Sequence, residues 1–171
     1  HIHGLEVENG YYPSKLCPLV QGEPFVLHST FERSIGSIPV HTPFLQINKG
    51  VDVVKEQFIS LGKELGAKVA TAGLSFDSAW KIQKELEEAM RKRGREALAE
   101  IEADPDRMGI VLFGRPYNAF APEANKGIPH KFASRGYTLI PMDFLDVRKI
   151  SPAHRMYWSM GQLILKAAEV V

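Results

Sequence analysis

Two short segments in the last third of the chain combine side chains that could bind an anionic ligand. The loop Gly114-Arg115-Pro116-Tyr117-Asn118 follows one continuous apolar run, and Asp143 follows a second. Arg115 offers a planar fork of donors for a carboxylate or phosphate, Tyr117 offers a stacking face with a hydroxyl, and Asn118 both donates and accepts. Asp143 is expected either to pair with Arg115 across the strand ends or to cap the following turn.

A structural role is the alternative for this loop, in which Arg115, Asn118 and Asn125 only satisfy its backbone. The loop matches neither GxGxxG nor a P-loop, so no motif indicates a nicotinamide or nucleoside triphosphate ligand. The six histidines show no zinc-binding spacing such as HExxH, and we assign no metal to them.

Cys17 is the one cysteine of the chain and lies in a loop-like segment between Lys15 and Pro18. Its thiolate could act as a nucleophile, as a redox thiol or as one ligand of a metal cluster, and a buried structural cysteine is the alternative. A nucleophile needs a base, and His28 and His41 are the nearest histidines in sequence. A cluster ligand needs three further soft donors, which would have to come from outside this chain.

The elements that position the anion-binding candidates are two predicted parallel strands. Gly109–Phe113 and Tyr137–Pro141 are apolar runs, and a helix predicted from Pro129 to Arg135 and closed by Gly136 lies between them. Strand, helix and strand in about 35 residues indicate a βαβ unit with a right-handed crossover. Ligands bind beyond the carboxyl ends of such strands, which is where Arg115 and Asp143 fall.

The rest of the chain is expected to be largely helical after residue 50. Apolar residues at helical spacing predict a long amphipathic helix over about 75–103, with Gly94 as a weak point, and a helix over 51–65 closed by Gly66. Lys81 to Arg107 carries 7 basic and 8 acidic residues, and this alternation is typical of a solvated helix face. Ser151-Pro152 is expected to open a final helix.

Residues 1–50 contain five prolines and two β-prone runs, 25–30 and 38–47. Because proline is confined to the ends and edges of sheets, we expect these runs to form short or edge strands. The fold class is therefore α/β, a layered parallel sheet of Rossmann or flavodoxin type with flanking helices. We expect a single domain over 1–171 cut from a longer protein, with a proline-punctuated segment (1–50), a helical segment (51–103) and a βαβ-α unit (109–171).

Composition excludes several classes of function. A formal charge of +1 gives no overall basic field for nucleic acid or anionic membranes. No apolar run approaches the roughly 20 residues of a membrane span, and the first thirty residues lack a signal peptide pattern. We therefore expect a protein that is not exported and that binds neither nucleic acid nor membrane.

Several segments together resemble one family, the CoA-substrate-specific enzyme activases related to activators of 2-hydroxyacyl-CoA dehydratases. The resemblance covers nearly the whole chain and is closest to the uncharacterised, dehydratase-like region of these large proteins. Its residues are Cys17 to Gly22, Ala79, Gln83, Ile110 to Asn118, Asn125, Gly127 to Pro129, Ile140 to Leu145, Met156 to Trp158, Gly161, Gln162, Ala167 and Ala168. The Gly-Arg-Pro-Tyr-Asn loop between strand and helix is the most specific of these segments.

The resemblance implies anaerobic, cytoplasmic iron–sulfur chemistry in which ATP hydrolysis drives an electron into a dehydratase. On that basis Cys17 would be one ligand of a [4Fe-4S] cluster completed in the parent protein or shared between subunits. Arg115, Tyr117, Asn118 and Asp143 would line a cleft for a cofactor or a CoA thioester. The ATP-binding domain of the family is absent from this sequence, so we attribute no ATPase activity to it.

The predicted function is therefore a domain of such an activase or dehydratase-like protein that contributes to an iron–sulfur or acyl-CoA site in the parent. Its partners would be other domains of the parent chain or a dehydratase subunit, and the fragment alone is not expected to be active. The alternative functions are a non-catalytic ligand-binding or subunit-docking domain and a thiol enzyme that depends on Cys17.

Overall fold

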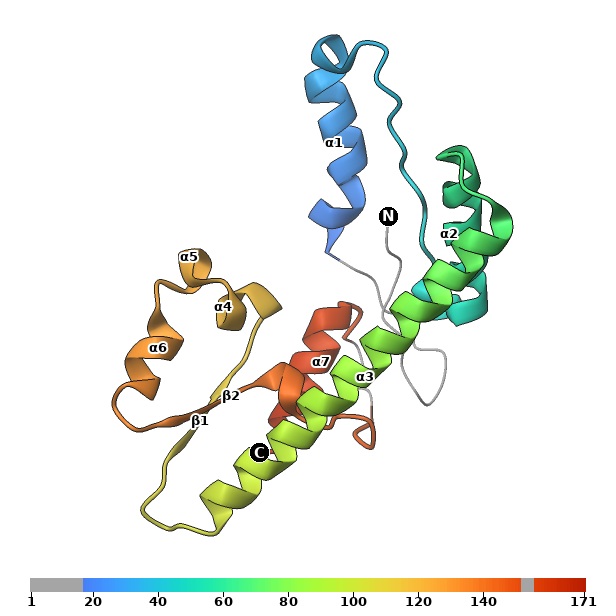
Figure 1. Ribbon diagram of the computed structural model, residues 1–171. Coiled ribbons are helices and arrows are strands. Elements are labelled where there is room, and N and C mark those ends of the chain that lie inside the picture. Colours follow the sequence, from blue (N-terminus) through green and yellow to red (C-terminus); the bar gives the residue numbers. More distant parts are fainter. Residues whose placement is uncertain (1–16, 152–155) are drawn as a thin grey trace. The chain divides into compact units, whose positions relative to one another are not determined.

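The computed structural model describes residues 17–151 and 156–171, and helix is its dominant element, at 64%. The chain divides into two compact units, His1–Lys81 with Met156–Ser159 and Ile82–Arg155 with Met160–Val171. Figure 1 labels their helices and strands in chain order. In the described part of the chain, no helix combines the length and the apolar character needed to cross a membrane.

The first described element of the first unit is helix α1 (Pro18–Ile35), which covers a run where a strand was expected. The β-prone run 25–30 lies inside this helix, so that expectation was wrong. Pro18 occupies the first helical position, where its fixed φ favours a helix and no N–H is needed. Pro24 lies inside the helix, yet the helix continues to Gly36, whose N–H donates to the Glu32 carbonyl at 3.2 Å.

The second β-prone run, 38–47, forms no strand ladder either. Its residues are extended or irregular, with an isolated bridge at Leu45 and a 3-10 turn η1 (Ile47–Lys49). Pro39 and Pro43 lack the N–H that a continuous ladder would use, which explains why the extended chain does not pair regularly.

Helix α2 (Val51–Glu64) matches the predicted helix, and Gly66 follows it in the left-handed region at φ 87°. The Ala67 N–H donates to the Gly62 carbonyl at 2.8 Å, so the chain turns sharply into the next helix. Phe58 of α2 contacts Phe76 of the next helix with ring centroids 5.4 Å apart, which holds the two helices together.

Helix α3 (Val69–Glu102) extends the predicted long helix by about two turns at its start. The stripe that predicted this helix consists of Phe76, Trp80, Gln83, Leu86, Met90, Ala97 and Ile101. It is only partly covered, because Ala97 is buried and Met90 half-buried, whereas Gln83 and Leu86 are exposed. Gly94, which was expected only to weaken the helix, is buried. A Cβ atom there would lie 2.0 Å from the carbonyl oxygen of Phe144, so the helix needs a glycine where it passes this backbone.

The second unit holds the expected parallel pair, β1 (Gly109–Leu112) and β2 (Thr138–Pro141). Three short helices, α4 (Pro116–Phe120), α5 (Pro122–Asn125) and α6 (Ile128–Ala133), connect the strands where one helix was predicted (Figure 1). Lys126 and Gly127 both have positive φ and separate α5 from α6. Among the described residues the sheet has these two strands, so the observed fold is a mixed helix and strand structure with a small parallel sheet.

The core of this unit is built by α3, β2, the 3-10 turn η2 (Met142–Phe144) and helix α7 (Ser159–Ala168). Its buried members are Ala97, Ile140, Met142, Leu145 and Ala167. Helix α7 begins at Ser159, and residues 156–158 before it are not helical. Pro152, at the predicted start of the last helix, lies outside the described residues.

Candidate functional site

The register of the small sheet brings the two predicted segments to one edge. Leu112 pairs with Pro141, and these are the last residues of β1 and β2. Neighbouring strands lie about 4.8 Å apart, so the chain leaves both strands side by side. Arg115 and Asp143 therefore belong to segments that start at the same carboxyl edge, as the sequence predicted.

A tight turn shapes the loop after β1. Gly114 has φ 138°, and a Cβ atom there would lie 2.5 Å from the side-chain nitrogen of Asn118. The Asn118 N–H donates to the Arg115 carbonyl at 2.8 Å, which closes the turn. Glycine is thus required at position 114 both by its backbone conformation and by the amide that lies over it.

The polar side chains of this loop differ in their burial and in their hydrogen bonding. Arg115 precedes helix α4 in an extended conformation and is half-buried. Tyr117 is 48% exposed and Asn118 is exposed, and neither side chain has a hydrogen-bond partner in the described part of the chain. Their polar groups are therefore available to a ligand.

Asn125 has the structural role that the sequence left open. Its side-chain nitrogen donates to the Ala119 carbonyl at 3.2 Å, and its side-chain oxygen accepts from the Gly127 N–H at 2.9 Å. Both polar ends of the amide are used to connect α4, α5 and α6, so Asn125 is not a ligand-binding candidate.

Asp143 lies in η2 and is half-buried. Burial raises the pKa of its carboxyl above the ordinary value, and a hydrogen bond from its own backbone opposes this shift. A neighbouring guanidinium would lower that pKa, and Arg115 does not contribute to the shift, so of the two expected roles of Asp143 the pairing with Arg115 is the one that its pKa does not support.

An aromatic contact that sequence reasoning missed joins the segments after the two strands. Phe120 of α4 and Phe144 of η2 have ring centroids 6.3 Å apart. The backbone of Phe144 also lies against Gly94 of α3. The turn that carries Asp143 is thus held between α3 and α4. The only sequence signal for this arrangement was a glycine inside an otherwise regular helix.

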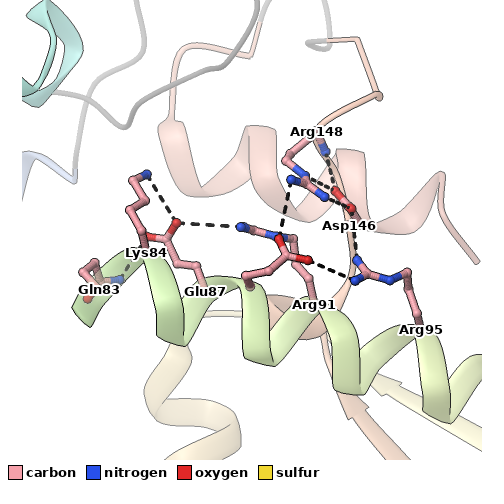
Figure 2. A network of polar contacts seen from close by, with 8 residues as sticks. Gln83, Lys84, Glu87, Arg91, Arg95, Asp146 and Arg148 are labelled. Carbon is pink, nitrogen blue, oxygen red and sulfur yellow. Dashed lines mark hydrogen bonds and ion pairs between the residues drawn. The ribbon is translucent and has the colours of Figure 1, made fainter. Parts of the chain in front are cut away.

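A network of charged side chains fixes the chain just beyond η2 to α3 (Figure 2). Glu88 of α3 lies 3.0 Å from Arg95 and 3.6 Å from Arg148, and Asp146 contacts both Arg148 and Arg95. The hydrogen bond from Arg148 is the main reason why the pKa of Asp146 falls to about 2. Hydrogen bonds from Arg95 and Arg91 likewise lower the pKa of Glu88.

Cys17 belongs to the other unit, at the residue that precedes α1. It is half-buried and forms no disulfide. Among residues 17–151 and 156–171, no three His, Cys, Asp or Glu side chains gather in a way that could hold a metal ion. The chain therefore offers one thiolate and does not fit a complete [4Fe-4S] cluster by itself.

His41, one of the two bases considered for Cys17, is paired elsewhere. Its Nδ1 lies 3.1 Å from Oε2 of Glu64, in an open groove of about 400 Å³ between residues 40–44 and α2. Gln57, Ser60 and Leu61 form the helical side of this groove. No sequence pattern indicated this groove, because its two walls come from separate segments.

The fold and the strand edge together define a mainly helical α/β protein whose polar loop emerges from a small parallel sheet. Residues 2–145 match the family model described as the CoA enzyme activase uncharacterised domain, so the chain belongs to this family. The resemblance inferred from the sequence is thereby confirmed. No curated protein and no solved structure matches the chain.

Proposed function

We propose that this activase-family domain binds the anionic part of a CoA thioester at the carboxyl edge of β1 and β2. The proposal is based on the strand register. Because Leu112 pairs with Pro141, the Arg115 loop and the Asp143 turn begin next to each other. Tyr117 and Asn118 add polar groups that the described part of the chain does not use.

The charges at this edge support an anionic ligand. Arg115 carries a permanent positive charge in a planar fork that fits phosphate or carboxylate oxygens. The raised pKa of Asp143 means that its carboxyl keeps a proton to higher pH than an ordinary aspartate. Asp143 therefore opposes an anion least at acidic pH, and the permanent charge of Arg115 is the argument for an anionic ligand.

Calorimetric titration of the chain with coenzyme A and with a short acyl-CoA thioester tests this proposal. Arg115→Ala should weaken binding at least tenfold, whereas Arg135→Ala should leave it unchanged. Arg135 is the control because it is exposed and its guanidinium donates to the Lys131 carbonyl of α6, away from the loop after β1. Thermal unfolding of both variants completes the experiment: a steep loss of stability in Arg115→Ala, or equal binding by all three proteins, would contradict the proposed role.

A second proposal concerns Cys17 as a single ligand of an iron–sulfur cluster shared with other domains of the parent or with a dehydratase subunit. Its position at the start of α1 is the observation in favour, because a helix N-terminus stabilises a thiolate. Three further ligands would have to come from outside this chain. In the parent protein purified without oxygen, Cys17→Ser should lower the iron and sulfide content, and an unchanged content would remove Cys17 from the ligand set.

A third part of the proposal is that β1 and β2 belong to a wider, layered Rossmann-like sheet in the assembled, cytoplasmic protein. Parallel strands are ordinarily covered on both faces and occur in larger sheets. Here Phe113 at the end of β1 stays 42% exposed, and Ile110, Val111 and Leu112 are only half-buried. In an assembled complex with a dehydratase subunit, the amides of β1 should exchange with deuterium more slowly than in the isolated chain. Equal exchange would argue against added strands.

A further inference from the structure

The open groove between residues 40–44 and α2 lies within the first compact unit and is separate from the strand edge. Its volume of about 400 Å³ falls in the range of small-molecule sites, about 300–1,000 Å³. Gln57, Ser60, Leu61 and Glu64 are spaced by three and four residues, so they form the helical wall from one face of α2. The groove is therefore a candidate ligand site that the proposal for the strand edge does not use.

Two contacts between side chains and the extended segment hold the walls of the groove together. The Gln46 N–H donates to the side-chain oxygen of Gln57 at 2.9 Å, and Nδ1 of His41 lies 3.1 Å from Oε2 of Glu64. The residues of these pairs are 11 and 23 positions apart in the sequence. The groove is thus formed before a ligand arrives, which reduces the ordering cost of binding.

The charge of the groove favours a cation. Among the described residues that line it, Glu64 is the one carboxylate, and none is a lysine or an arginine. His41 contacts Oε2 alone, whereas a carboxylate can accept several hydrogen bonds on its two oxygens. The Glu64 side chain is 58% exposed, and its Oε1 has no partner in the described part of the chain. This oxygen is available to a ligand that donates.

The position of Glu64 in α2 adds to the negative charge. Glu64 is the last residue of the helix, where the backbone dipoles present their negative ends and favour a cation. Lys63 lies in the same turn, but it is not one of the residues that line the groove. A positive group bound at Glu64 would therefore be attracted by both the carboxylate and the helix end.

The remaining walls of the groove are largely apolar and indicate an organic cation. Val40, Pro43, Phe44 and Leu61 line it, and Val40 and Phe44 are 50% and 42% exposed. A metal ion would need several ligands, and within the described ranges no three His, Cys, Asp or Glu side chains gather to supply them. An ammonium group with an alkyl chain matches both the carboxylate and the apolar walls, and an aromatic ring such as Phe44 also attracts a cation.

A purely structural role is the alternative for the pair of His41 and Glu64, which would then only fix the extended segment to α2. That role uses one oxygen of the carboxylate. It requires neither the second oxygen nor the exposed apolar side chains opposite α2, whereas an alkylammonium ligand uses both.

We propose that the groove between residues 40–44 and α2 binds a primary alkylammonium group. The ammonium donates to Oε1 of Glu64 while His41 holds Oε2, and the alkyl chain covers the apolar walls. The group belongs either to a small free amine or to a lysine side chain, which share this chemistry. The site is independent of the proposal for a CoA thioester.

Nuclear magnetic resonance titration of the isotopically labelled chain with pentylamine tests this proposal. Amide signals of residues 40–44 and of the second half of α2 should shift with one saturable dependence on concentration. Pentanoate, which has a chain of similar length and a negative head group, should cause no saturable shift. Nα-acetyl-lysine methylamide distinguishes the sources: tighter binding than that of pentylamine assigns a lysine side chain, and weaker binding assigns a free amine.

Two variants of α2 test the role of the carboxylate. Glu64→Gln should weaken the binding of pentylamine about tenfold, because it removes the charge and leaves an amide oxygen that still accepts from His41. Glu56→Gln is the matched control, since Glu56 is exposed on the same helix and does not line the groove, and it should bind like the wild type.

Three results would overturn the proposal: no saturable shift with pentylamine, equal binding of pentanoate, or wild-type affinity in Glu64→Gln. Thermal unfolding shows whether both variants are folded. The comparison of pentylamine with pentanoate uses the unaltered chain, so it decides the question even if Glu64→Gln is unstable.

Discussion

Replacing Gly94 by alanine should destabilise the chain even though alanine is the better helix former. In an exposed helix interior the change would stabilise by about 0.8–1 kcal/mol. At position 94 the new Cβ would lie 2.0 Å from the Phe144 carbonyl oxygen, whereas ordinary C···O contacts begin near 3.3 Å. Helix α3 and η2 would have to separate by more than about 1 Å, and such overpacking costs about 1–3 kcal/mol or more.

The expected net effect of Gly94→Ala is a loss of about 2 kcal/mol, or a Tm lower by about 4–8 °C. Gly73 provides a matched control in the same helix, because a Cβ there would meet Ile59 and Lys55 at ordinary contact distances of 3.6 and 3.9 Å. Gly73→Ala should therefore raise the Tm by a few degrees. Calorimetry or circular dichroism measures both changes, and equal Tm values for the two variants would refute the close approach of α3 to η2.

Three further predictions concern the strand edge, the charged network and α1. Gly114→Ala should destabilise by about 1–3 kcal/mol, because residue 114 has φ 138° and its Cβ would meet the Asn118 amide; unchanged denaturant midpoints would contradict this. Asp146 should contribute roughly 1 kcal/mol after allowance for solvent screening, and because its pKa is lowered to about 2, this contribution is present above about pH 4 and is lost as the pH falls toward 2. In urea titrations, the free energy of unfolding of Asp146→Asn should therefore change less with pH than that of the wild type. Identical pH profiles for the two proteins would exclude the ion pair between Asp146 and Arg148. Pro24→Ala should strengthen the far-ultraviolet helix signal by restoring one backbone hydrogen bond in α1, so an unchanged or weaker signal would count against the described helix.

Elements with a strong apolar periodicity, or with glycine or proline at their ends, were predictable from the sequence. The helix over 51–65 and the parallel strands near Gly109 and Tyr137 were found nearly where they were expected. In these segments the apolar pattern, the glycines and the charges agree with one another, so local preference and tertiary contacts favour the same structure.

Helix α1 was missed because the local signals conflict. Its β-branched and aromatic residues favour a strand, and Pro24 disfavours a helix interior, yet Pro18 supplies a good helix start. The intrinsic preferences involved are small and easily outweighed.

The candidate site was predictable only in part, for a geometric reason. The strand edge followed from the order of apolar runs and loops, because parallel strands end at a common edge. The contacts of Phe144 with Phe120 and Gly94, and the charged network around Glu88 and Asp146, join residues far apart in the sequence. Periodicity within one segment carries no information about such pairs.

The register of β1 and β2 also has a consequence for the order of folding. Paired positions such as Gly109 and Thr138 are 29 residues apart in sequence. Closing a loop of this length costs about 3 kcal/mol in chain entropy, which is low for a parallel pair. The pair can therefore form early if α3 supplies its apolar cover, and φ-values near Val111 and Ile140 should be higher than those in α1. The strand edge that carries Arg115 and Asp143 would then belong to the folding nucleus.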